Sequence, residues 1–118
     1  MIKIIDDNYK GTLNFLGSNS GFIGLNTSAY KIINSDTLVL IDSGYTVFNE
    51  IINRKLLKNI KNINIIITHM HLDHIGSLSQ LILYSYFKLG INVNILSKCK
   101  ELNKFLKITG CEKALYNF

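Results

Sequence analysis

Hydrophobic residues along this chain of 118 residues fall into short runs whose spacing alternates between that of strands and that of helices. Two runs rich in β-branched and aromatic residues, 27–33 and 37–41, flank the turn-forming segment 34–36 and predict a β-hairpin. The second run is apolar over 38–41, as expected for a strand that is covered on both faces. Further strands are predicted at 1–5, 12–16, 63–68 and 91–96.

Apolar residues at spacings of three and four predict helices between these strands. The three helices expected in this way cover residues 46–60, 75–89 and 98–109. Thr46 is suited to cap the first, and Gly90 is suited to end the second. A hairpin followed by alternating helices and strands predicts an α/β (α+β) fold, in which helices pack on a mixed sheet.

No clear helix or strand is predicted for the C-terminal segment 111–118. A strand at 91–96 would normally be followed by more sheet, so the architecture indicated by the sequence is incomplete. The exposed edge expected there favours association with another strand, because unpaired sheet edges recruit partners.

Composition supports a folded, reduced protein. A hydrophobic content of 47% is sufficient for a core. The net charge of +5 is weak support for polyanion binding, because Arg54 is the one arginine among the 13 basic residues. Cys99 and Cys111 form no CxxC pair and are predicted to be reduced, small hydrophobic residues. Acidic residues at 6–7 and the absence of long apolar runs predict a cytoplasmic protein with no membrane partner.

All three histidines lie within six residues, in the segment His69-Met70-His71-Leu72-Asp73-His74. Residues two apart in an extended chain point the same way, so His69 and His71 can reach one metal ion, and the following turn brings Asp73 and His74 nearby. Imidazole and carboxylate ligands suit Zn²⁺, and also Mn²⁺ or Fe²⁺. Two such ions, ~3.5–4 Å apart, would activate a bridging water at neutral pH. The alternative is that packing or surface histidines cluster by chance.

The run 68–76 resembles the HxHxDH signature of the metallo-β-lactamase superfamily, and the segment 38–44 resembles the strand of that family that ends in aspartate and glycine. The resemblance implies an incomplete αββα domain of which residues 1–118 form the N-terminal part. It implies that His69 and His71 bind a first metal and that Asp73 and His74 bind a second. Asp73 could also hold the proton of the nucleophile, which makes it the candidate catalytic residue. Asp42 would orient the metal-binding histidines without binding the metal itself, or would be only a turn residue at the end of a strand.

Softer similarities favour one branch of the superfamily. The segments 17–22, 25–30 and 73–78 resemble ribonuclease Z-like phosphodiesterases. This resemblance implies a metal-dependent hydrolase that cleaves a phosphodiester in RNA, a nucleotide or another small molecule. The alternatives are a thioester or lactam hydrolase of the same superfamily, or a truncated, non-catalytic metal-binding or interaction module.

The resemblance also implies further metal ligands that the sequence does not contain. In this family the second half of the domain supplies another histidine to each metal and a bridging aspartate, whereas no histidine follows His74 and no aspartate follows Asp73. We therefore expect a fragment of an enzyme, a homodimer of half-domains, or a chain that associates with a missing C-terminal half. The prediction for the chain alone is Zn²⁺ binding with weak or no hydrolysis.

Overall fold

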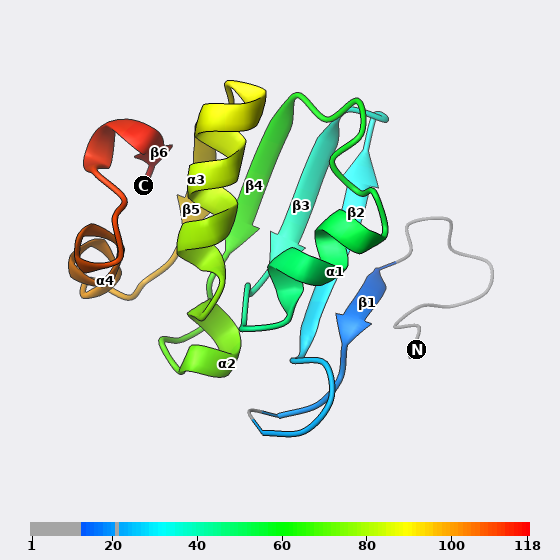
Figure 1. The fold of residues 1–118 in the computed structure, drawn as a ribbon, viewed down its shortest axis with the longest axis horizontal. Helices are drawn as coiled ribbons and strands as arrows, with labels where there is room; N and C mark the ends of the chain where they lie inside the picture. The colour runs from blue at the N-terminus through cyan, green and yellow to red at the C-terminus, as the bar shows by residue number, and fades with distance from the viewer. Residues whose placement is uncertain (1–12, 21) are drawn as a thin grey trace.

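The computed structural model describes residues 13–20 and 22–118. Within them a six-stranded sheet runs in the order β1-β2-β3-β4-β5-β6. β1, β2 and β3 pair antiparallel, and β3 to β6 pair parallel, so the predicted mixed sheet is confirmed (Figure 1). The strand expected at 1–5 lies outside the described residues. The strands are β1 (Asn14–Gly17), β2 (Ser28–Ile33), β3 (Thr37–Ile41), β4 (Asn62–Ile66), β5 (Val93–Leu96) and β6 (Tyr116–Asn117).

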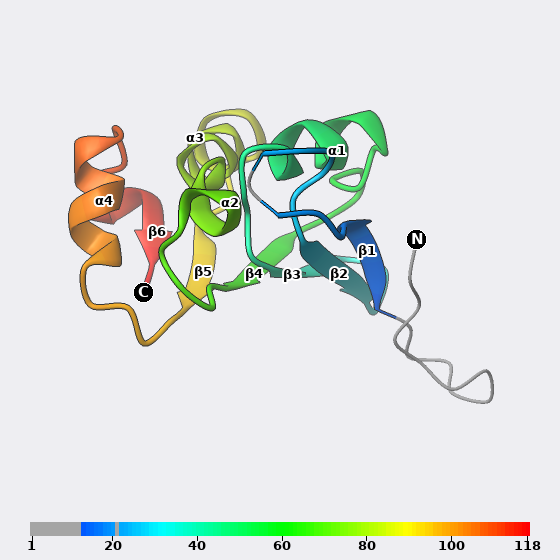
Figure 2. The ribbon, with the colours of Figure 1, turned by 90° about the horizontal axis from the view of Figure 1, so that it is seen from below.

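The helices are distributed unequally about the sheet. They are α1 (Val47–Asn53), α2 (Leu72–Ile75), α3 (Leu78–Leu89) and α4 (Leu102–Ile108), with the short 3₁₀ helix η1 (Lys113–Leu115) before β6. In Figure 2, α1, α2 and α3 lie on one face of the sheet and α4 lies beside β6. No helix of the described residues covers the opposite face, which we call the open face.

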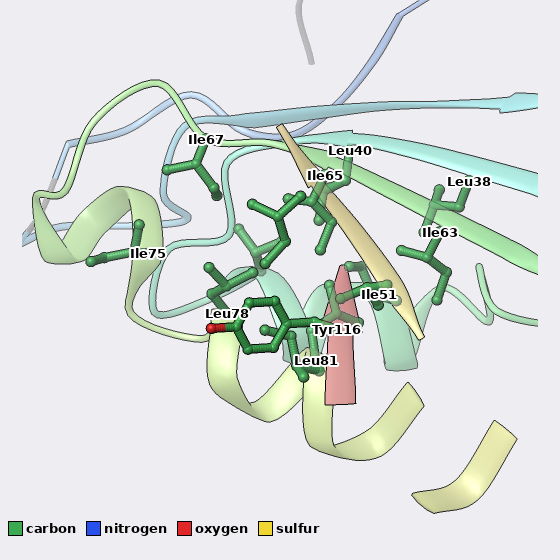
Figure 3. Packing of buried hydrophobic residues seen from close by; sticks show 14 of the residues in the cluster. Leu38, Leu40, Ile51, Ile63, Ile65, Ile67, Ile75, Leu78, Leu81 and Tyr116 are labelled. Atoms are coloured by element: carbon green, nitrogen blue, oxygen red, sulfur yellow. The ribbon is translucent and has the colours of Figure 1, made fainter. Parts of the chain in front are cut away.

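Side chains that alternate along the central strands form the core between the sheet and the helices. Leu38 and Leu40 of β3 are fully buried, and so are Ile63 and Ile65 of β4 (Figure 3). They pack with apolar residues of the helices, including Ile51, Ile75, Leu78 and Leu81. Burial of each such side chain contributes about 1.5–3 kcal/mol, so this face carries most of the apolar stabilisation.

The open face bears two rows of side chains that cross the parallel strands. In the first, which we call the asparagine row, the amide Nδ2 of Asn94 donates to Oδ1 of Asn64 at 2.9 Å, and Asn117 Nδ2 donates to Asn94 Oδ1 at 2.9 Å. In the second, the register aligns Ile41, Ile66 and Leu96 at the carboxyl ends of β3, β4 and β5. The Leu96 side chain is 69% exposed. The open face is therefore polar along its middle and apolar at one end.

The first helix is shorter than predicted. α1 ends at Asn53 instead of residue 60, and Lys55 and Asn59 then adopt left-handed φ angles of 56° and 64°. Such angles interrupt a right-handed helix, although the apolar spacing continues beyond them. Thr46 is the N-cap residue of α1, as predicted, but its side chain makes no capping hydrogen bond; its Oγ1 accepts a hydrogen bond from the backbone N–H of Asn26 at 2.8 Å.

The second helix predicted at 75–89 corresponds to α3, which begins three residues later, at Leu78; Ile75 is the last residue of α2, and the chain breaks at Gly76-Ser77 between the two helices. Gly90 ends α3 with a left-handed φ of 68°, as predicted. The expectation of no element in 111–118 was wrong, because η1 and β6 lie there. β6 pairs with β5 through Val93↔Tyr116 and Asn94↔Asn117, so the edge of β5 expected to be bare is partly covered.

The two cysteines, Cys99 and Cys111, form no disulfide. Burial raises the pKa of the Cys111 thiol, so this side chain stays protonated at neutral pH and packs as a core residue. Among the described residues, no helix combines the length and the apolar character needed to cross a membrane.

Candidate metal centre

The histidine cluster lies at the carboxyl ends of the parallel strands β3 and β4. Because these strands run in the same direction, the segments that follow them leave the sheet at one edge. Asp42 follows β3 directly, and its backbone N–H donates to the carbonyl of Ile66 at 2.8 Å. Thr68 and His69 follow β4. The pairing of the two strands thus brings Asp42 against the start of the motif, 26 residues later in the chain.

The buried Asp42 carboxylate is the centre of a hydrogen-bond network that reaches the surface at Thr68. Asp42 adopts a left-handed φ of 63°, which aspartate tolerates better than most residues. Its side chain is only 5% exposed. Oδ1 accepts from the backbone N–H of Thr68 at 2.8 Å, and Oδ2 accepts from Thr68 Oγ1 at 2.6 Å. Oδ2 also lies 2.7 Å from Nδ1 of His74. Asp42 is therefore both a turn residue and a partner of the histidine motif.

This network determines which nitrogens of two histidines carry protons. A carboxylate can only accept, so Nδ1 of His74 must be the donor to Asp42. The single hydroxyl proton of Thr68 goes to Asp42, so Thr68 Oγ1 accepts from Nδ1 of His69, which lies 3.0 Å away. With Nδ1 protonated in a neutral ring, Nε2 is the atom with a free lone pair. Both His69 and His74 thus present Nε2 as a potential metal ligand.

His74 and Asp73 face one another in a way that suits a cation. Nε2 of His74 lies 3.4 Å from Oδ2 of Asp73. In the neutral tautomer fixed by Asp42, both atoms are acceptors, and two acceptors this close repel unless a proton or a metal ion lies between them. Two ligands of a tetrahedral Zn²⁺, each about 2.0–2.1 Å from the metal, are separated by about 3.4 Å. This pair fits a divalent ion in both chemistry and spacing.

The rings of His69 and His71 are close but not arranged around a common point. The ring centroid of His69 lies 4.7 Å from that of His71 and 3.9 Å from that of His74. In residues 13–20 and 22–118, no three His, Cys, Asp or Glu side chains together form a site that could hold an ion. The donor types fit a metal, but their arrangement in this part of the chain does not yet surround an ion. His71 is exposed, so its ring can turn without disturbing the core.

The loop after β3 is clamped to the motif by hydrogen bonds between buried groups. The backbone N–H of Ser43 donates to the carbonyl of His74 at 2.7 Å, and Ser77 N–H donates to the Ser43 carbonyl at 2.9 Å. The hydroxyls of Ser43 and Ser77 lie 2.9 Å apart, and both residues are fully buried. At Gly44 a Cβ would overlap the carbonyl oxygen of Asp73. Only glycine permits this close approach.

The structure brings together every residue that the sequence singled out. The predicted metal ligands and Asp42 lie within one connected group of side chains: His69, His71, Asp73, His74 and Asp42. The roles of Thr68, Ser43 and Ser77 were not predicted from the sequence. Thr68 could have been noticed from its position between a buried strand and the first histidine. No local sequence pattern distinguishes Ser43 or Ser77, which are hydrogen-bonded to each other and lie 34 residues apart in the chain.

Comparison with known proteins places the chain in a family. Residues 11–107, most of the sequence, match the model of the family described as anti-Pycsar protein Apyc1. The chain belongs to the Apyc1 family. No curated protein matches it significantly.

A solved structure supports the fold of this Apyc1-family chain. The metallo-β-lactamase fold protein YhfI from Bacillus subtilis superposes with a TM-score of 0.66 at 17% identity. The match covers 89% of this chain and 43% of YhfI. The predicted metallo-β-lactamase-like fold is confirmed, and the chain corresponds to less than half of that relative. The finer resemblance to ribonuclease Z-like phosphodiesterases stays a prediction.

Proposed function

We propose that this chain carries one wall of a metal-dependent phosphodiesterase site that hydrolyses a cyclic nucleotide. The observation that carries the proposal is the Asp42 network, which leaves Nε2 of both His69 and His74 free to bind an ion. Membership of the Apyc1 family suggests a cyclic nucleotide as the substrate. A divalent ion held there would supply the Lewis acidity that polarises a phosphodiester and acidifies a water molecule.

The residues of the chain have distinct roles in this proposal. His69 and His71 would hold one ion, and Asp73 and His74 a second, with Zn²⁺ preferred and Mn²⁺ or Fe²⁺ possible for this donor set. Asp73 would also accept a proton from the attacking water. Asp42 holds His74 by its Nδ1–H and would keep the imidazole oriented during the reaction.

Completion of the proposed site requires donors from outside residues 1–118. No histidine or aspartate occurs after His74, and the chain matches only 43% of YhfI. We propose that a polypeptide equivalent to the unmatched part of YhfI supplies the remaining ligands and covers the open face. The apolar row Ile41, Ile66 and Leu96 supports this, because it continues from the site across β3, β4 and β5.

A non-catalytic role in metal or nucleotide binding is the second candidate. It is favoured by the absence, among the described residues, of three donor side chains already arranged around an ion. The two candidates differ in what the chain does when it is loaded with metal. Both predict binding of an ion, and only the first predicts cleavage once the missing ligands are provided.

The test is metal analysis followed by an assay of 3′,5′-cyclic nucleotide hydrolysis. We expect the purified chain to bind Zn²⁺ and the double variant His69→Ala/His71→Ala to lose most of it. Lys58→Ala, which changes an exposed residue outside the cluster, should bind as the wild type does. The chain alone should cleave weakly or not at all. Unchanged metal content in the histidine variant would refute the assignment of the ligands.

A longer protein that includes a C-terminal half separates the candidates. With that half present, metal-dependent conversion of a cyclic nucleotide to a linear nucleotide is expected, and it should disappear in the histidine variant. Binding without conversion would leave the non-catalytic role as the correct one.

A further inference from the structure

A hollow of about 300 Å³ lies between the end of α1 and the end of α3. α3 begins at Leu78, shortly after the histidine motif, and Figure 1 shows that it runs along the sheet to the opposite end. The hollow is therefore separate from the candidate metal centre. Most of its lining is apolar or aromatic and comes from Ile51, Ile52, Leu57, Tyr84 and Leu89.

The apolar lining is partly open to solvent and partly fixed by the core. Ile52 is 38% exposed and Leu89 is 36% exposed, whereas Ile51 is fully buried. The ring of Tyr84 packs edge-on against Phe48, with ring centroids 5.5 Å apart, so its position is held from behind. Exposed apolar side chains grouped around one depression are typical of a binding site.

Two exposed lysines, Lys55 and Lys58, also line the hollow. In the part of the chain that the structure describes, no carboxylate forms an ion pair with either of them. The acidic residue of α1, Glu50, is paired with Arg54 at 2.8 Å instead. Both ammonium groups are therefore available to an anion at the rim of the hollow.

These lysines are not needed to complete the end of α1. The carbonyls of Ile51 and Ile52 accept hydrogen bonds from the backbone N–H groups of Leu56 at 3.0 Å and Lys55 at 3.1 Å. Lys55 also has a left-handed φ of 56°, a conformation that glycine adopts at lower cost. Backbone strain of this kind is often found at functional sites, so a lysine retained at this position favours a role for its side chain.

We propose that this hollow binds a carboxylic acid with an alkyl chain, whose carboxylate meets Lys55 and Lys58. The chain would lie on the apolar lining, including Leu57 and Leu89. A peptide in the same place would bring backbone amides that need partners, and the only polar group on the apolar lining side chains is the hydroxyl of Tyr84. An alkyl chain needs no such partner. The volume is at the lower end of small-ligand pockets, which favours a short chain.

The test is an NMR titration of the metal-free chain with octanoate, octan-1-ol and butyrate. Octan-1-ol keeps the alkyl chain without the charge, and butyrate keeps the charge without most of the chain. We expect octanoate to bind about fivefold more tightly than octan-1-ol, as exposed ion pairs predict. It should bind about tenfold or more tightly than butyrate, because more methylene groups are buried. The methyl signals of Ile52, Leu57 and Leu89 should shift.

Variants of the lining separate the two parts of the ligand. Lys55→Gln/Lys58→Gln should lower the affinity for octanoate to that for octan-1-ol and leave octan-1-ol binding unchanged. Leu89→Ser should weaken the binding of both. The matched control, Lys100→Gln/Lys107→Gln, removes two exposed lysines outside the hollow and should retain every wild-type affinity.

Lys55→Gly distinguishes binding from a structural role of the turn. Glycine relieves the left-handed conformation, so the unfolding temperature should equal or exceed that of the wild type. The affinity for octanoate should nevertheless fall about twofold, as loss of one exposed charge partner predicts. An unchanged octanoate affinity in Lys55→Gly would remove Lys55 from the proposed site.

The proposal is independent of the proposed function and can fail separately. Equal affinity for octanoate and octan-1-ol, or unchanged octanoate binding in the double glutamine variant, would overturn the carboxylate assignment. Equal affinity for octanoate and butyrate would overturn the alkyl site, and the absence of octanoate binding would overturn both. Zinc binding by the double glutamine variant should match that of the wild type in every case.

Discussion

The two walls of the candidate metal centre are held together in different ways. The inner wall consists of Asp42, Thr68 and His74; the Asp42 side chain is 5% exposed and that of His74 is 16% exposed, whereas Thr68 is exposed. Its members are joined by hydrogen bonds of 2.6–2.8 Å. The outer wall consists of Tyr45 and Leu72, each about half exposed, and the exposed His71. There, apolar packing replaces the hydrogen bonds.

The difference indicates a division of labour between the walls. Metal binding requires donor atoms at defined positions. Asp42 fixes the tautomer of His74 directly and that of His69 through Thr68, so the Nε2 atoms of both rings are free to accept an ion before it binds. Recognition of a substrate body tolerates more variation and needs access from solvent. Substitutions in the inner wall should therefore lower both stability and metal affinity, whereas substitutions in the outer wall should leave the stability of the fold almost unchanged.

The largest expected effect comes from Gly44→Ala, in the loop that joins Asp42 of the inner wall to α1. The new Cβ would overlap the Asp73 carbonyl, so the backbone of one loop must move. We expect a loss of about 3 kcal/mol in the free energy of unfolding, at the upper end for overpacked sites. His71→Ala, on the outer wall, should change it by less than about 0.5 kcal/mol. Urea unfolding of both variants measures the contrast, and equal stabilities would contradict it.

Asp42→Asn should weaken metal binding about 10–100-fold, as loss of a partner behind a metal-binding histidine does. An amide NH₂ facing Nδ1 of His74 would donate to it and leave the proton on Nε2, the nitrogen needed for the ion. Zinc titration against a chromophoric chelator gives the affinity. ¹⁵N NMR of the histidine rings in the metal-free protein reports the tautomer directly.

The control for this change is Asp36→Asn, another carboxylate-to-amide replacement. Asp36 accepts a hydrogen bond from the neighbouring Thr37 in the β2–β3 turn, far along the chain from the motif. Its variant should retain wild-type zinc affinity and ring tautomers. A wild-type tautomer at His74 in Asp42→Asn would show that Asp42 does not set the proton position.

Thr68→Val should have the smallest effect, about tenfold or less in zinc affinity, because the backbone N–H of residue 68 still binds Asp42. The variant loses the hydroxyl that links Asp42 to Nδ1 of His69, so His69 should populate both tautomers. Thr68→Ser keeps the hydroxyl and should restore the wild-type spectrum and affinity. Failure of serine to restore them would assign the effect to packing instead of to hydrogen bonding.

The parts of the fold that the sequence predicted best are the central strands. β3 was recognisable as a compact apolar run, although the expectation that it is covered on both faces was wrong, because its side chains alternate between the core and the open face. β4 was recognisable from the isoleucines that alternate with asparagines along it. β6 was missed because two residues carry no periodic signal and are a strand only through pairing with β5. The predicted end of α1 was wrong because Leu56 and Ile60 keep the helical spacing in a segment that has left the helix.

The same distinction applies to the site. Spacing within six residues sufficed to predict that the side chains of His69, Asp73 and His74 gather, because short segments hold their own geometry. Their assignment as metal ligands stays a prediction. The contributions of Thr68 and Ser77 depend on Asp42 and Ser43, which β3 places beside them from more than 25 residues away. No local pattern encodes such partners, since strand pairing creates them.

The asparagine row of the open face has a consequence for how that face meets water. Asn64, Asn94 and Asn117 pass hydrogen bonds from strand to strand, and each amide retains further donor and acceptor capacity toward solvent. Burying a polar amide without a hydrogen-bond partner is costly, so any layer over the sheet must trap water or supply polar groups along the middle. The row therefore makes a tight, fully apolar seal over the centre of the open face unfavourable.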